Sequence, residues 1–163
     1  MQIFNPSAPF TRPADTTQYA IGDLVANSTT AGSVVPMSIS LGNTFGPGQF
    51  RLTRVRLVRS GTTAITSATF RAHFYSTSPT VANGDNGAWS SSGAAGWLGS
   101  IDLPTMTLFT DGASSVGGAT AGSEFLIRLA AGSTVYALLA ALGTYTPAAS
   151  DAFTLTLEEM EAY

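Results

Sequence analysis

Turn-forming residues punctuate this chain from one end to the other. Clusters of Gly, Pro, Ser, Thr, Asn and Asp recur roughly every ten residues, with short runs of β-branched and aromatic residues between them. Intervals this short suit strands, whereas a helix needs a longer run with a 3.6-residue apolar period and capping residues. No run in the sequence combines the helical period with caps at both ends. The spacing therefore predicts an all-β protein, an antiparallel β-sandwich of eight or nine strands.

The expected strands lie near residues 19–26, 34–41, 49–59, 68–76, 97–103, 105–109, 124–130, 133–142 and 152–160. Two of these segments alternate cleanly between apolar and polar residues. The apolar face takes Phe70, Ala72 and Phe74 in one, and Phe153, Leu155 and Leu157 in the other. Such alternation is typical of an antiparallel sheet with one face on a core.

The segment "FRLTRVRLV" breaks this alternation. Its apolar residues change parity half-way, since Phe50 and Leu52 are even-numbered whereas Val55 and Leu57 are odd-numbered. A regular strand cannot direct all four inward, because successive side chains point to opposite faces. One extra residue near Thr53 would restore the pattern, which predicts a β-bulge.

The same bulge gathers Arg51, Arg54 and Arg56 on the opposite face. Four of the seven cations lie in residues 51–59, so this stripe is the main positive feature of the chain. Three carboxylates near the end of the sequence can pair with it, within the fold or across a subunit boundary: Glu158, Glu159 and Glu161. Exposed pairs contribute only about 0–1 kcal/mol each, so they set register and partner choice more than stability.

The segment "GSTVYALLAALG", residues 132–143, fits two structures. Ser133 suits a helix N-cap, Gly143 suits a helix end, and Ala and Leu favour helix. A helix of uncharged residues would have no polar face, however, so a strand covered on both faces fits as well. The β-rich surroundings favour the strand.

Two segments rich in Gly and Ser are expected to be loops. Residues 77–96 form the longer one, and its only bulky residues are Val81 and Trp89. Residues 110–124 form the second. Loops of this length are usually functional or ordered by a partner.

Charge is scarce in this chain. Only 10% of residues are charged, with no lysine, against a usual ~25%. Such a surface suits a protein packed against neighbours, although a compositional bias of genome or habitat gives the same pattern. The net charge of −3 argues against nucleic-acid binding. We expect no secretory signal, and no membrane segment, because the apolar stretch 135–142 is far shorter than the ~20 residues of a spanning helix.

No group of residues predicts catalysis, a cofactor or a metal site. His73, the only histidine, lies in mid-strand and is expected to be a sheet-face residue. The segment "NGDNG", residues 83–87, has the residues of tight turns and lacks the alternating ligands and closing Glu of an EF-hand. The chain has no cysteine, which excludes thiolate chemistry.

The first thirteen residues, "MQIFNPSAPFTRP", carry three prolines and the large apolar side chains of Ile3, Phe4 and Phe10. The prolines keep the segment extended. Two interpretations stay open. Residues 1–13 are an arm for a groove on a partner, followed by a single domain over residues 14–163, or they are a first strand on their own domain. In the first case, removing the arm weakens partner binding and leaves the sandwich folded.

Residues 10–28 read F-x-RPAD-T-x-x-Y-x-x-GD-L-V-A-N-S, and this order resembles the opening of small structural proteins of tailed bacteriophages. The segments "HFYSTSPTVANGDNGAW", "GWLGSIDLP" and "YALLAALGTYTPAASDAFTLTLEE" follow in the same order as in those proteins. The resemblance covers most of the chain. The signature residues read as structural: Arg12, Asp15, Tyr19, Gly22 and Asp23. Gly22 allows unusual backbone geometry, and Asp23 can bond nearby amides.

The relatives of this kind are head decoration, or cement, proteins. The resemblance implies a sandwich of jelly-roll type that sits on the outer capsid surface of a virion as a dimer or trimer. It would clamp neighbouring copies of the major capsid protein together and have no catalytic residues.

We therefore expect a non-enzymatic decoration protein. Its expected partner-binding residues are Ile3, Phe4, Phe10, Arg12, Arg51, Arg54 and Arg56. The alternative is a tail, fibre or receptor-binding domain that recognises cell-surface glycans through Trp89, Trp97 or Tyr145, although Trp97 reads as core. A hydrolase using His73 is a third and weaker hypothesis.

Overall fold

The computed structural model describes residues 3–41, 48–61, 68–90, 95–119, 125–129, 133–158 and 160–162. These residues contain fourteen strands and no helix, hence none long and apolar enough to cross a membrane. The strands are β1 Ile3–Phe4, β2 Ser7–Thr11, β3 Leu24–Val25, β4 Met37–Ser40, β5 Gly48–Leu52, β6 Arg54–Ser60, β7 Phe70–Tyr75, β8 Trp97–Leu103, β9 Thr107–Phe109, β10 Gly112–Gly118, β11 Phe125–Leu129, β12 Thr134–Ala141, β13 Ala152–Glu158 and β14 Met160–Ala162.

Every pairing between these strands is antiparallel, which confirms the predicted all-β class. The number of described strands exceeds the expected eight or nine. Four of them are only two or three residues long, and one expected strand is split in two.

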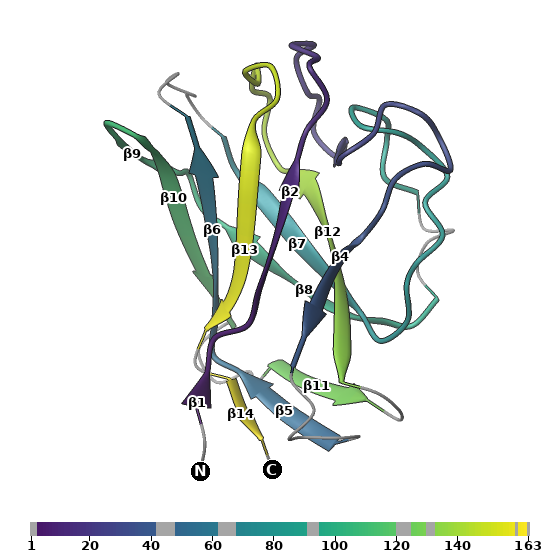
Figure 1. The fold of residues 1–163 in the computed structure, drawn as a ribbon, viewed down its shortest axis with the longest axis vertical. Coiled ribbons are helices and arrows are strands. Elements are labelled where there is room, and N and C mark those ends of the chain that lie inside the picture. The colour runs from purple at the N-terminus through teal and green to yellow at the C-terminus, as the bar shows by residue number, and fades with distance from the viewer. Residues whose placement is uncertain are drawn as a thin grey trace.

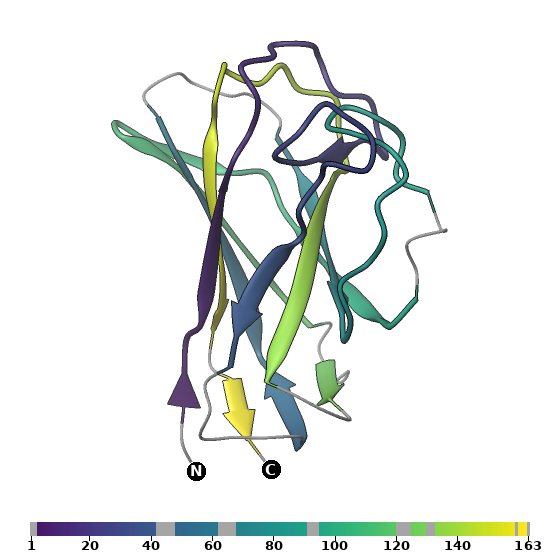
Figure 2. The same ribbon diagram turned by 45° about the vertical axis from the view of Figure 1, so that its right-hand side comes forward.

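The strands form three sheets. The first sheet has the order β2-β13-β6-β10-β9, and the second has the order β3-β12-β7-β8, with β4 also paired to β12. The basal sheet has the order β1-β14-β5-β11. The first and second sheets run along the long axis of the molecule, and the basal sheet lies at the end where β1 and β14 meet (Figures 1 and 2).

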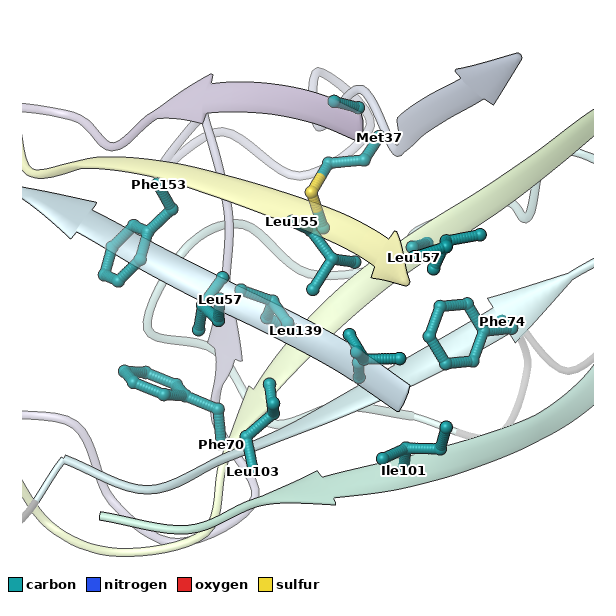
Figure 3. Close-up of a cluster of buried hydrophobic side chains, with 14 of the residues drawn as sticks. Met37, Leu57, Phe70, Phe74, Ile101, Leu103, Leu139, Phe153, Leu155 and Leu157 are labelled. Atoms are coloured by element: carbon teal, nitrogen blue, oxygen red, sulfur yellow. The ribbon is translucent and has the colours of Figure 1, made fainter. Parts of the chain in front are cut away.

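The main core fills the space between the first and second sheets (Figure 3). Leu57 and Phe153 enter it from the first sheet, and Phe70 and Leu139 enter it from the second. The rings of Phe70 and Phe153 meet edge to face, with centroids 5.7 Å apart, a favoured aromatic geometry. The two sheets therefore form the predicted sandwich, and the alternating segments around Phe70 and Phe153 bury the faces expected of them.

Thr53 is where the chain passes from the basal sheet into the first sheet. β5 ends before it and β6 begins after it. Phe50 and Leu52 are buried on one side of this point, and Val55 and Leu57 are buried on the other. The predicted change of parity is confirmed. It arises from a break between two sheets, and the bulge expected within one strand is not what produces it.

β12 is a strand, as predicted for the ambiguous segment, and it is covered on both faces. On one face Leu139 belongs to the main core. On the other face Leu138 packs in a second cluster with Val81 and Trp89. These two residues anchor the long loop, described over residues 77–90, on the outer face of the second sheet (Figure 2).

Residues 112–118 form β10, although their Gly- and Ser-rich sequence predicts a loop. β10 pairs with β6 along its whole length. At Gly117 it approaches β8 so closely that an added Cβ would lie 2.2 Å from the carbonyl oxygen of Asp102. The residues of β10 are small because its backbone lies close to that of β8. A prediction based on large apolar residues therefore misses this strand.

Two further expectations are corrected. Trp97 is 52% exposed and not core, because the β7–β8 register shifts beside Leu98 and turns Trp97 outward. The segment 19–26 contributes only the two residues of β3 as a strand. Gly22, with a φ of +90°, forms a turn before it, so the Gly-Asp pair marks a bend as expected.

We predict that Gly117→Ala destabilises the protein by about 1–3 kcal/mol, because the new methyl group forces two backbones apart. Gly118→Ala is the matched control, since the nearest atom to its added Cβ is 3.5 Å away. Urea unfolding of both variants measures the difference. Equal stability of the two would contradict the close contact between β10 and β8.

Candidate partner-binding surface

Five of the seven predicted partner-binding residues come together at the basal end. β1 holds Ile3 and Phe4 and pairs with β14, which in turn pairs with β5, the strand of Arg51. The chain then enters β6, where Arg54 and Arg56 occupy outward positions of the first sheet. Antiparallel pairing thus joins the beginning, the middle and the end of the sequence (Figure 1).

Glu158 joins two arginines of this group. It lies 2.6 Å from Nε of Arg54 through one carboxylate oxygen and 2.8 Å from Nε of Arg56 through the other. The Glu158 side chain is 9% exposed, while the two arginine side chains are 49% and 46% exposed. One carboxylate therefore serves two guanidinium groups, and these three residues together keep one net positive charge.

The predicted pairing of the acidic tail with the arginine stripe is confirmed, within the fold, for Glu158. Glu161 stands opposite Arg51 in the register of β14 and β5. Glu159 lies outside the described residues.

Phe10 and Arg12 do not belong to this group. β2 pairs with β13 over its whole length, so residues 7–11 form a strand on their own domain. Phe10 is half-buried against the core and stacks on Phe153 with ring centroids 5.4 Å apart. The Arg12 side chain is fully buried, so the expectation that it contacts a partner is corrected. Arg12 points inward because a buried carboxylate is there to receive it.

That carboxylate belongs to Asp85, in the long loop. It lies 2.7 Å from Nη2 of Arg12, and it accepts hydrogen bonds from the Tyr19 hydroxyl at 2.6 Å and from the Ala26 N–H at 2.7 Å. Arg12 also donates from Nε to the Tyr19 hydroxyl. Burial alone lowers the pKa of Arg12, but the hydrogen bond to Asp85 and the neighbouring charges raise it overall, so Arg12 stays charged. We call these three side chains, Arg12, Tyr19 and Asp85, the clamp.

The other signature residues also have structural roles. Asp15 accepts hydrogen bonds from the backbone N–H and the hydroxyl of Thr17, and Asp23 accepts one from the N–H of Ala20. A second buried ion pair lies beside the clamp, where Arg59 contacts Asp151 at 2.6 Å. The signature residues therefore stabilise the end of the sandwich opposite the basal sheet, which we call the upper end.

Two stacked tyrosines at the upper end differ in the hydrogen bonding of their hydroxyl groups. The rings of Tyr19 and Tyr145 lie 4.9 Å apart, and both are buried. The Tyr19 hydroxyl belongs to the clamp, whereas the buried Tyr145 hydroxyl has no hydrogen-bond partner in the described part of the chain. Burial raises the pKa of both hydroxyls, so both stay protonated.

The segment "NGDNG" forms a turn, with Asn86 at a φ of +63°, and its Asp85 binds protein donors. Among the described residues, no three His, Asp or Glu side chains gather to hold a metal ion. His73 lies in the middle of β7, as predicted, with the ring of Trp89 6.0 Å away. Burial and the charge of Arg71 lower the His73 pKa to about 4.

The outer faces of the two large sheets differ. On the second sheet, Leu138 and Tyr75 point outward yet are only 3% and 1% exposed, because the long loop covers them. On the first sheet, the outward residues Arg56, Ser60 and Val116 are exposed, and no described segment covers them. The first sheet is therefore the open one.

Comparison with known proteins places the chain in no family: no protein-family model and no curated protein matches it.

We predict that removing the hydroxyl group destabilises the protein at Tyr19 and has almost no effect at Tyr145. Tyr19→Phe removes a hydrogen bond to a buried carboxylate and costs about 1–3 kcal/mol. Tyr145→Phe changes stability by less than about 0.5 kcal/mol, because its hydroxyl gives up no described bond. Thermal or urea unfolding compares them, and a larger loss for Tyr145→Phe would refute this account of the clamp.

His73 predicts a loss of stability in acid. Its pKa is about 6.5 in the unfolded chain and about 4 in the folded protein. The unfolded chain therefore takes up the proton first as pH falls, so stability present above pH 6.5 is lost towards pH 4. His73→Gln should remove about 3 kcal/mol of this loss by pH 4, because each pKa unit of difference corresponds to about 1.4 kcal/mol. Urea unfolding across that range checks it, and identical pH profiles for the variant and the parent are the contrary result.

Proposed function

We propose that this protein is a non-enzymatic decoration protein of a tailed bacteriophage, which binds the outer surface of the major capsid protein shell and stabilises it. In this proposal the sandwich is of jelly-roll type, the protein acts as a homo-oligomer, and the basal end faces the shell. The observation that carries the proposal is the convergence of Ile3, Phe4, Arg51, Arg54 and Arg56 at that end.

The chemistry of the basal end supports adhesion to another protein. The guanidinium groups of Arg54 and Arg56 are held by Glu158 and remain about half exposed. A planar, partly fixed guanidinium binds carboxylates and backbone carbonyls on a partner at a lower entropic cost than a freely rotating one. The low charge of the whole chain, with 10% charged residues, also suits a molecule packed among neighbours.

Retention on a shell does not need a strong single contact. A decoration protein with several subunits engages several capsid proteins at once, so weak contacts combine into tight binding. The upper end, with its two buried ion pairs, supplies a rigid body for such contacts.

The alternative, a glycan-recognising tail or fibre domain, has one observation in its favour. Trp97 is 52% exposed and can offer a ring to a sugar. The other two aromatic residues suggested for that role are engaged elsewhere, since Trp89 packs in the second cluster and Tyr145 in the main core. The basal end therefore makes the stronger case.

We predict that the double variant Arg51→Ala, Arg54→Ala lowers retention on the shell by about tenfold or more, because each lost contact is repeated over many subunits. The assay is co-sedimentation with shells assembled from the major capsid protein encoded in the same genome. Arg71→Ala is the matched control, because Arg71 is a partly exposed arginine paired with Asp102 on the second sheet. Full retention of the double variant on the shell would contradict the proposal.

A truncation that tests the proposal has to stop before β2. Removing residues 1–4 takes away β1 only. Removing residues 1–13 also removes β2 and Arg12, and it leaves Asp85 buried without its cation. Loss of one partner from a buried pair costs roughly 3–5 kcal/mol, so the longer truncation reports on folding instead of binding.

A further inference from the structure

The open outer face of the first sheet carries exposed apolar residues at two separate positions along its strands, one near the basal end and one near the upper end. Val116 of β10 is 45% exposed and lies in the register row of Arg56, near the basal end. Phe109 of β9 is 60% exposed and lies in the row of Gly112, near the upper end. Exposed apolar residues on a sheet face, at a free edge, favour association with another surface.

The charges on this face are also separated along the strands. At the basal end Arg54, Arg56 and Glu158 keep one net positive charge. At the upper end Asp111, at the turn between β9 and β10, is exposed and negative. The row between them is uncharged and consists of Pro9, Thr154, Val58, Ser114 and Thr107, paired across all five strands.

We propose that this face binds the same face of a second copy of the chain, about a twofold axis that lies between the two sheets and crosses the strands over the row of Val58. This inference specifies the self-association contained in the proposed function. A twofold axis so placed exchanges the row of Val116 with the row of Phe109. It therefore sets a basal end against an upper end on both sides of the axis.

This exchange of rows covers the exposed apolar residues and also pairs the opposite charges. Phe109 of one copy comes to lie beside Val116 of the other, so each covers exposed apolar surface. Asp111 of one copy comes within reach of Arg56 of the other, and the charges are opposite. A twofold interface repeats each contact, so two apolar contacts and two ion pairs form together.

A shallow hollow on this face receives the second copy. It has a volume of about 400 Å³, and its lining includes Arg56, Val58, Phe109, Asp111 and Ser114. The uncharged middle row lets two sheets approach to the usual separation of about 10 Å without burying an unpaired charge.

The area predicts a dimer of moderate strength. Of the five strands of this face, β13, β6 and β10 have seven residues each, β2 has five and β9 has three. With strands about 4.8 Å apart and about 3.4 Å per residue, the face covers roughly 470 Å². Two copies then bury on the order of 1,000 Å², near the lower limit of specific interfaces. Concentration of the protein on a surface would favour this dimer.

The test is sedimentation velocity of the full chain over a wide concentration range, with circular dichroism to verify folding. We expect a reversible dimer, weakened about tenfold or more by Phe109→Ala and by Asp111→Arg. Higher salt should also weaken it, because the Asp111–Arg56 pairs are screened. Leu108→Ala, on the other side of β9, and Trp97→Ala, outside the face, are the controls and should leave dimerisation unchanged.

A charge exchange makes the test specific. Arg56→Asp alone should dissociate the dimer, and the double variant Arg56→Asp, Asp111→Arg should restore it. A protein that stays monomeric, a trimer, no rescue by the double variant, or a dimer lost with Trp97→Ala but kept with Phe109→Ala would each overturn the inference. Shell retention is measured in a separate assay with the Arg51→Ala, Arg54→Ala variant, whose two residues make none of the named dimer contacts, so the failure of one proposal is distinguishable from the failure of the other.

Discussion

The buried carboxylate of Asp85 holds together segments that lie far apart in the sequence. It binds Arg12 from the N-terminal segment, Tyr19 from the segment before the Gly22 turn, and the backbone of Ala26 after β3. Asp85 itself belongs to the long loop. One buried group therefore fixes three separate parts of the chain, and because each bond satisfies a group that burial would otherwise leave unpaired, the arrangement is strongly specified.

The clamp decides which surface of the molecule is open. With Asp85 held in place, the loop of residues 77–90 lies on the second sheet and brings Val81 and Trp89 onto Leu138. The first sheet has no comparable cover in the described chain, and its outward residues Arg56, Ser60 and Val116 stay exposed. In the proposed assembly, the open face of the first sheet binds a second copy of the chain. The basal end, where the candidate arginines gather, binds the shell.

Several elements were predictable because their physical cause is local. Alternation in β7 and β13 gave both the strands and their buried faces, since side chains of a strand alternate by geometry. The parity change at Thr53 was also visible, although the sequence could not distinguish a bulge from a passage between sheets. β10 was missed because small residues are needed where it packs closely against the backbone of β8, and β8 is a separate segment of the sequence.

Composition and alternation alone predicted the fold class, the inward faces of the long strands, and an arginine stripe with acidic partners. These follow from alternation and composition, which act over a few residues. The three-dimensional pairing of distant segments was needed to establish that Arg12 is buried, that Phe10 packs on its own domain, and that Arg51 and Arg54 share one end with β1. These depend on which distant segments pair, and that choice is made by the whole set of buried contacts at once, because no single segment can satisfy its own buried groups.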